Sequence, residues 1–192
     1  MRRLSDHEIG GPSLRAGAIL RRVGPGARGV EVGVFRGALS QKLLDGGVVR
    51  LFMVDNWLPA GDQPEHYKAT GDWHALRPID GVTSDERKAR EVARRSNGRA
   101  VVLKMPSVEA ARQINDGSMD FVFLDADHSY EGVRDDIAAW LPKVRKGGWL
   151  SGHDYASDHP DYDFTGVKRA VDEAFPEGVE LDENFCWFVR CG

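Results

Sequence analysis

Cysteine is scarce in this sequence. The two cysteines, Cys186 and Cys191, lie close together near the C-terminus and have no C-x-x-C spacing. They therefore have no partners for a thiolate zinc site. We expect both to be packing residues. A disulfide between them is conceivable, but a reducing compartment would keep them as thiols.

Long apolar runs and an excess of basic residues are also missing. No run approaches the roughly 18 apolar residues of a membrane span, and no apolar core follows the charged residues 1–8. We therefore expect a cytoplasmic protein, with neither secretion nor membrane contact. Lys and Arg number 26 against 30 Asp and Glu, and the two signs are mixed, as in residues 85–95. This balance gives no electrostatic case for a nucleic-acid partner.

The first predicted strand lacks the glycine pattern of a dinucleotide site at its end. This strand, residues 29–34, turns through Gly33 and Gly37 into a helix over 35–44, with the spacing G-x-x-x-G. An NAD enzyme is disfavoured, because its turn reads G-x-G-x-x-G. The missing Cβ atoms still let the backbone approach a ligand, and the helix directs N–H groups at negative charge.

Two acids belong to the first two predicted strands. Glu31 would be buried in the first, where a carboxylate is costly without a cationic partner. A ligand ammonium group could supply that partner; alternatively, Glu31 caps backbone groups of the loop. The second strand, residues 48–54, is apolar except for Arg50 and ends at Asp55. Asp55 follows the glycines by about twenty residues, where an acid can accept hydrogen bonds from ribose hydroxyls.

The length and the order of the patterns predict the architecture. The 192 residues, 41% of them hydrophobic, fit a single domain over residues 1–192. Alternating strands and helices predict an α/β fold with a doubly wound, mainly parallel sheet of seven strands and a C-terminal antiparallel hairpin. Strands are expected at 29–34, 48–54, 100–103, 119–124, 149–153, 179–181 and 185–190. Helices are expected at 13–23, within an N-terminal entry region 1–27, and at 35–44, 85–96, 107–115, 130–144 and 166–175.

Residues 56–84 interrupt this alternation with proline, glycine, histidine and aromatic residues. A connection of this length inside a compact domain is usually a functional lid or a disordered insertion. Trp57, Tyr67 and Trp73 favour the lid, because disordered segments are poor in aromatic residues. We expect a short helix at 64–70 and a mobile lid over the site.

Acids and imidazoles follow the fourth and fifth predicted strands. Asp125, Asp127 and His128 come directly after the fourth, and His153 and Asp154 end the fifth. Ligands of open α/β sheets bind beyond the carboxyl ends of the strands, so these two clusters predict one pocket. The alternative is that Asp127 or Ser129 caps the following helix.

Four motifs together resemble those of class I S-adenosylmethionine-dependent methyltransferases. They are residues 31–37 (Glu-Val-Gly-Val-Phe-Arg-Gly), Asp55, residues 124–131 with D-x-D-H-x-Y, and residues 146–154 with G-G-x-x-x-x-H-D. The resemblance spans residues 28–190 and implies a Rossmann-like methyltransferase fold. It is nearest to small bacterial methyltransferases related to metal-dependent sugar and catechol O-methyltransferases and to the cephalosporin hydroxylase group.

The resemblance also implies a binding site for S-adenosyl-L-methionine at the ends of the first four strands. The residues that it assigns to the cofactor are Glu31, Gly33, Phe35, Gly37, Asp55, Met105, Ser107 and Asp125. Among them, the group from Glu31 to Gly37 would surround the methionine part. Asp55 would hold the ribose hydroxyls, and Met105 and Ser107 would flank the adenine.

A divalent cation is a further implication. Relatives bind one with acids at the ends of strands four and five, which here are Asp125, His153 and Asp154. This mixed set suits Mg²⁺ less well than Mn²⁺, Fe²⁺ or Zn²⁺. The implied catalytic residues are Asp125, whose cation would lower the pKa of the acceptor hydroxyl, and His128, which could take its proton. In the alternatives, His128 is the lone base of a metal-free site, or a helix-start residue bonded to a carboxylate.

The activity implied is O-methylation of a small hydroxylated acceptor, a sugar or a natural product. A metal-dependent hydroxylase of the same fold and a non-catalytic cofactor-binding protein are the alternatives. A nucleic-acid methyltransferase is disfavoured by the acidic charge. A homo-oligomer is left open.

Overall fold

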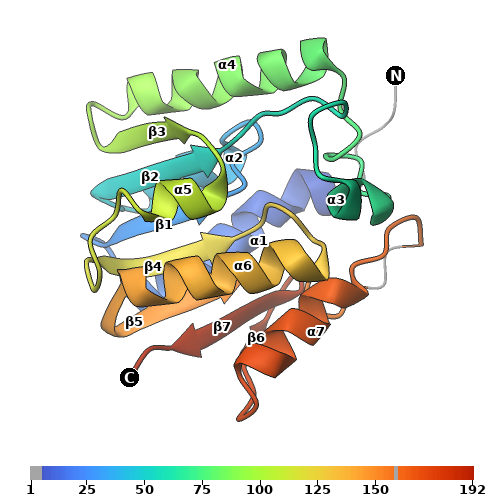
Figure 1. The fold of residues 1–192 in the computed structure, drawn as a ribbon. Helices are drawn as coiled ribbons and strands as arrows, with labels where there is room; N and C mark the ends of the chain where they lie inside the picture. The colour runs from blue at the N-terminus through green and yellow to red at the C-terminus, as the bar shows by residue number, and fades with distance from the viewer. Residues whose placement is uncertain (1–5, 158–159) are drawn as a thin grey trace.

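A seven-stranded sheet forms the middle layer of the structure, in the order β3-β2-β1-β4-β5-β7-β6 (Figure 1). The computed structural model describes residues 6–157 and 160–192, so the predictions for residues 1–5 of the entry region lie outside the described residues. The strands are β1 (Arg28–Val32), β2 (Arg50–Asp55), β3 (Ala100–Lys104), β4 (Met119–Leu124), β5 (Val144–Gly152), β6 (Glu180–Asp182) and β7 (Cys186–Arg190). The helices are α1 (Asp6–Val23), α2 (Ala38–Asp45), α3 (Glu65–Ala69), α4 (Ile79–Arg95), α5 (Ser107–Ala111), α6 (Tyr130–Trp140), the 3₁₀ turn η1 (Leu141–Lys143) and α7 (Thr165–Ala174).

The strand directions confirm the predicted sheet. The neighbouring strands β3, β2, β1, β4 and β5 run parallel to one another. β7 pairs antiparallel with β5 on one side and with β6 on the other. The fold is therefore the doubly wound, mainly parallel sheet with a C-terminal antiparallel hairpin that the sequence predicts.

Helices cover both faces of the sheet. In β4, Val122 and Leu124 belong to the core beneath α5, α6 and α7, whereas Phe121 and Phe123 belong to the core beneath α1 and α2. Figure 1 shows α5 and α6 in front of the sheet and α1 and α2 behind it. Because both faces are buried, β2 and β4 are largely apolar, with Arg50, Asp55 and Asp120 as their charged residues. The packed cores hold the carboxyl ends of these strands in fixed positions.

The predicted starts of two helices are wrong. α1 begins at Asp6 and not at residue 13, although Gly10, Gly11 and Pro12 have low helix propensity. α4 begins at Ile79, directly after Pro78, and not at residue 85. Its first turns contain Gly81 and Thr83, which are poor helix formers, but Val82 and Asp85 are buried and hold the helix in place.

Other bounds also differ, and α5 ends at Ala111 and not at residue 115. α2 begins at Ala38, because Phe35 and Gly37 have positive φ angles of 54° and 79° that no helix contains. α6 ends at Trp140, and Pro142 lies in the 3₁₀ turn that follows. β5 begins at Val144, five residues earlier than predicted, and its pairing with β4 shifts register between Met119 and Phe121.

The letters G-x-G-x-x-G do occur, at Gly24, Gly26 and Gly29. They precede β1 and run into its first residues, so they lie at the opposite end of the strand from a phosphate-binding turn. The spacing therefore has no bearing on a nucleotide site. Among the described helices, none has both the length and the apolarity to cross a membrane.

Candidate functional site

A cavity of about 650 Å³ lies at the carboxyl ends of β1, β2, β4 and β5. Its volume is in the range of small-molecule and cofactor sites. The lining includes α1, the segment 56–78 between β2 and α4, and residues 162–164. The predicted site residues among its lining are Glu31, Gly33, Phe35, Asp55, Met105, Ser107, Asp125, His128, His153 and Asp154.

Gly33 brings the ends of β1 and β4 together. Its φ angle is 90°, and a Cβ atom there would lie 1.9 Å from the carbonyl oxygen of Asp125. On the other side of this contact, the N–H of Asp125 donates to the carbonyl of Val32 at 2.8 Å. No side chain fits at residue 33, so the glycine allows the turn to lie directly against Asp125.

Gly37 has a different position from the one expected. It is the N-cap of α2, and a Cβ atom there would lie 3.2 Å from a side-chain carbon of Val92 and 3.3 Å from the Cα of Ala89. The glycine lets α4 pack closely against the start of α2. It does not line the cavity, so the structure offers no support for its predicted contact with the cofactor.

Asp55 organises the loop that follows β1. One carboxylate oxygen accepts from the backbone N–H groups of Val34 (3.0 Å) and Phe35 (2.9 Å), and the other from that of Trp57 (2.8 Å). Burial raises the pKa of Asp55, and these three N–H groups oppose the shift. The carboxylate lines the cavity and retains acceptor capacity, so its contact with a ribose stays a prediction.

Glu31 is satisfied by the protein itself. It is 1% exposed, and its carboxyl group accepts a hydrogen bond from the hydroxyl of Ser40 on α2. Burial raises the pKa of Glu31 to about 8, although the Ser40 bond lowers it. The hydrogen bond from Ser40 gives the buried carboxyl group a partner within the protein, and its contact with a ligand ammonium group stays a prediction.

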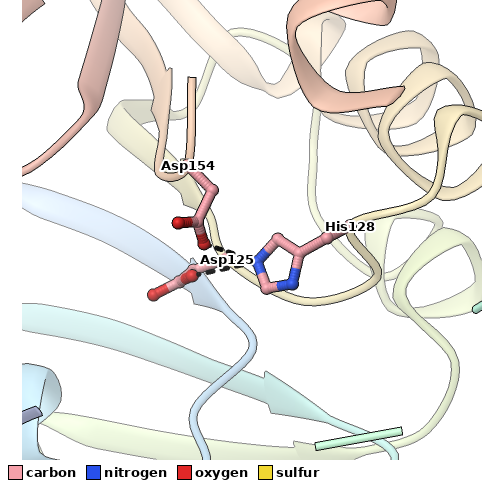
Figure 2. Close-up of side chains that lie close together, drawn as sticks. All are labelled: Asp125, His128 and Asp154. Atoms are coloured by element: carbon pink, nitrogen blue, oxygen red, sulfur yellow. Dashed lines mark hydrogen bonds and ion pairs between the residues drawn. The ribbon is translucent and has the colours of Figure 1, made fainter. Parts of the chain in front are cut away.

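The two predicted clusters meet in one place, shown in Figure 2. Nε2 of His128 lies 3.3 Å from Oδ1 of Asp125 and 3.2 Å from Oδ2 of Asp154. All three residues line the cavity beside the turn at Gly33. β4 positions the first two residues and β5 positions the third, so the parallel sheet brings together groups that are distant in sequence.

Two further residues complete this cluster, and sequence reasoning missed both. A guanidinium nitrogen of Arg15 on α1 lies 2.5 Å from Oδ2 of Asp125. Oδ2 of Asp72, in the segment 56–78, lies 2.7 Å from Nδ1 of His128. Neither stands in a motif. Their roles depend on how α1 and the segment 56–78 dock, which no local pattern in the sequence records.

The charges of the cluster compensate one another. Burial lowers the pKa of His128, but hydrogen bonds with Asp125 and Asp72 and the charge of Asp154 raise it well above its ordinary value. Burial raises the pKa values of the three carboxylates, whereas the facing imidazoles, and Arg15 in the case of Asp125 and Asp154, lower them overall. The carboxylates around His128 therefore favour its protonated form.

His153 lies at the side of this cluster. Its Nδ1 is 2.8 Å from Oδ2 of Asp154, and its Nε2 is 3.2 Å from Oδ1 of Asn184. The described side chains whose ligand atoms come within 4.8 Å of one another are those of Asp125, His128 and Asp154. Two carboxylates and an imidazole are a donor set that fits a divalent transition metal. Nδ1 of His153 also lies 3.6 Å from Oδ1 of Asp125, so the predicted set of Asp125, His153 and Asp154 stays a prediction.

The predicted alternative of a helix cap is confirmed for Ser129. Its Oγ accepts from the N–H of Gly132 at 3.0 Å, at the start of α6. Asp127 accepts from the N–H of Ser129 at 2.9 Å, and its other oxygen lies 3.2 Å from Nε2 of His66. Asp127 therefore shapes the turn and does not join the His128 cluster.

The far end of the cavity holds Met105 and Ser107, which follow β3. The indole N–H of Trp140 donates to Oγ of Ser107 at 2.8 Å. Beside it, burial raises the pKa of Asp136 to about 7, while a hydrogen bond with Ser107 lowers it. This end is lined by protein groups from α5 and α6 and lies apart from the charged cluster.

The segment 56–78 packs on the site. Trp57 is 6% exposed, and its indole N–H donates to the carbonyl of Phe35 at 2.9 Å. The short helix α3 (Glu65–Ala69) confirms the predicted helix at 64–70, and it buries Tyr67. The structure shows how the segment docks; its movement stays a prediction. Of the polar loop that follows β5, residues 158 and 159 lie outside the described residues.

Solved structures with the same fold include several methyltransferases. They include the calicheamicin methyltransferase CalS11 (17% identity, 98% of this chain and 81% of that chain, TM-score 0.71) and the O-methyltransferase NovP (17%, 92% and 79%, TM-score 0.63). Another solved structure with this fold is the cofactor-bound Rv0187 from MTB (17% identity, 97% of this chain and 79% of that chain, TM-score 0.56). At these identities the similarity shows the fold alone.

The family comparison covers most of the site. A search of the curated proteins finds no match to the sequence. The family model described as a methyltransferase domain matches residues 30–155, from within β1 to just beyond β5. The matched range is more than half of the chain and contains Gly33, Asp55, Asp125 and His128. The chain therefore belongs to this methyltransferase family, as a class I S-adenosylmethionine-dependent methyltransferase.

Proposed function

We propose that this protein methylates a hydroxyl oxygen of a small acceptor such as a sugar. The observation that supports this most is the buried cluster of Asp125, His128 and Asp154 in the same cavity as the turn at Gly33 and Asp55. A cofactor held at that turn would have ionisable groups within reach of its reacting end. Among the structures of this fold, CalS11 is described as a TDP-rhamnose 3'-O-methyltransferase, which supports a sugar-type acceptor.

The residues present fit the cofactor. Gly33 lines the cavity and lets the β1 turn lie against Asp125, Asp55 presents carboxylate oxygens for ribose hydroxyls, and Met105 and Ser107 line the end suited to adenine. S-Adenosylmethionine supplies an activated methyl group for in-line displacement. The chain must then place the acceptor oxygen in line and relieve it of its proton.

His128 and its carboxylates are the groups suited to that proton transfer. Nε2 of His128 faces the cavity between Asp125 and Asp154. The negative charges of Asp125 and Asp154 raise the pKa of His128. An acceptor hydroxyl or a cation that bonds to these carboxylates would weaken this effect, and the imidazole could then accept a proton. Asp125 and Asp154 are the side chains that would hold a divalent cation, whose charge would acidify the acceptor hydroxyl.

A direct test incubates the purified protein with S-adenosylmethionine and a panel of nucleotide sugars and hydroxylated natural products. We expect equal amounts of S-adenosylhomocysteine and singly methylated acceptor by mass spectrometry. Asp125→Asn should reduce turnover about a hundredfold or more, whereas the matched surface variant Asp116→Asn should be as active as the wild type. Cofactor binding without consumption for the whole panel would favour a non-catalytic protein. A hydroxylated product would favour a hydroxylase.

The cation is tested separately with a chelator. If Asp125 and Asp154 hold a cation, excess chelator should abolish turnover while the affinity for S-adenosylhomocysteine stays nearly unchanged. Full methyl transfer by metal-stripped protein in excess chelator would contradict the cation. His128 would then be the lone base, and His128→Ala would be the most damaging single change.

A further inference from the structure

Asp72 is a buried carboxylate that no motif indicated. It lies in the middle of the segment 56–78 and is 1% exposed. Its Oδ1 accepts from the backbone N–H of His74 at 2.8 Å and lies 3.1 Å from Nδ1 of that ring. Its Oδ2 accepts from the hydroxyl of Tyr67 at 3.0 Å and lies 2.7 Å from Nδ1 of His128. A buried carboxylate with this many donors has a single orientation.

The shortest of these ring contacts joins Asp72 to His128. The ring of His128 is 7% exposed, and Phe164 packs against it with ring centroids 4.5 Å apart. With Nδ1 held by Asp72, the other nitrogen, Nε2, is directed at Asp125 and Asp154. An imidazole has two distinct nitrogens, and the group that binds one determines which way the other points.

We propose that Asp72 is the positioning residue of His128. It holds the ring with Nε2 facing the reacting centre, so that docking of the segment 56–78 and alignment of the histidine are one event. The inference rests on the proposed function, because it assigns His128 to the methyl-transfer centre. The physical basis is general: a carboxylate on the far nitrogen of a functional imidazole fixes its tautomer and orientation, and its loss leaves the ring in place but misaligned.

The kinetic test uses Asp72→Asn, which keeps the size of the side chain and removes its charge. With the acceptor that the panel identifies, kcat should fall about a hundredfold or more, because an amide can donate to Nδ1 and force the proton onto Nε2. The KM for S-adenosylmethionine should stay within about twofold. Asp62→Asn, an exposed position of the same segment, is the matched control and should be as active as the wild type. A kcat within about threefold of the wild type would overturn the proposal.

A second test needs no turnover and covers the case in which Asp72→Asn fails to fold. In the wild-type protein, nitrogen-resolved NMR of the His128 ring should show a proton on Nδ1 that is downfield and protected from exchange. A ring with no proton on Nδ1 would overturn the proposal. In His128→Ala, the amides of residues 66–76 should exchange about tenfold faster than in the wild type, while those of β3 stay unchanged. Unchanged exchange at 66–76 would show that the two parts are not coupled.

The two tests separate this inference from the proposed function. If no acceptor is methylated but the NMR and exchange results are as expected, the proposed function fails and the Asp72–His128 coupling stands. If the acceptor is methylated equally well by the wild type and Asp72→Asn, the proposed function stands and the positioning role fails.

Discussion

Gly33 and Gly26 have nearly the same backbone conformation and very different surroundings. Their φ angles are 90° and 87°, but a Cβ at Gly33 would meet the Asp125 carbonyl, whereas a Cβ at Gly26 would meet nothing within 4 Å. Gly26→Ala should cost about 1 to 2 kcal/mol, the strain of a left-handed L-residue. Gly33→Ala should cost several kcal/mol more and weaken cofactor binding. Urea unfolding measures both, and equal losses would contradict the close contact of β1 and β4.

Asp55 makes a separate prediction for binding. Each hydrogen bond to a charged group contributes about 1.5–3 kcal/mol, so Asp55→Ala should raise the Kd for S-adenosylhomocysteine about a hundredfold or more. The variant also loses the acceptor of the Val34, Phe35 and Trp57 N–H groups, so thermal unfolding must show that it is folded. Calorimetry that gives unchanged affinity in a folded variant would remove the ribose assignment.

At the scale of elements, the sequence predicted the short helix of the segment 56–78 but not the contacts that this segment makes with the site. Composition predicted a lid with a short helix, and the helix is present as α3. The strands β2 and β4 were predictable because they are largely apolar. The clusters at Asp125 and Asp154 were predictable because each follows a predicted strand of the sheet. The roles of Asp72, Arg15 and Ser40 were not predictable from the sequence. Each of these side chains contacts a site residue on another helix, strand or loop, and only the packing of the two elements brings the pair together.

The tryptophans of this segment test its movement. Trp57 is already buried and hydrogen-bonded to Phe35, whereas Trp73 is half-buried and packs against the Arg77 guanidinium, 4.2 Å from the ring centroid. If the segment closes on ligands, S-adenosylhomocysteine and acceptor should change the fluorescence and reduce protease cleavage within 56–78. Trp73→Phe should remove most of that change. Identical fluorescence and cleavage with and without ligands would contradict a lid.

For the whole molecule, the buried acids make stability depend on pH. The pKa of Glu31 is about 8 in the folded protein against an ordinary 4.5. Between these values the unfolded chain is ionised and the folded chain is protonated, so stability falls as pH rises, by about 1.4 kcal/mol per pH unit for one group. Asp136 acts in the same direction up to about pH 7. The pKa values of Asp72, Asp125 and Asp154 are lowered in the folded protein. Stability is therefore lost through these acids only when the pH falls below the ordinary pKa of an aspartate.

Glu31→Gln isolates one of these contributions. The amide keeps an acceptor for Ser40 and cannot ionise, so the loss of unfolding free energy from pH 5.5 to 7 should be less steep by about 1.4 kcal/mol per pH unit. Urea unfolding at several pH values measures this slope. Parallel curves for variant and wild type would mean that Glu31 is ionised in the folded protein.

The account as a whole places the cofactor and the reacting centre in one cavity at the carboxyl end of the sheet. A crystal structure with S-adenosylhomocysteine tests this most directly. We predict ribose hydroxyls within hydrogen-bond distance of Asp55, and the sulfur directed at the cluster of Asp125, His128 and Asp154. A cofactor bound outside this cavity, or one whose sulfur faces away from that cluster, would contradict the account.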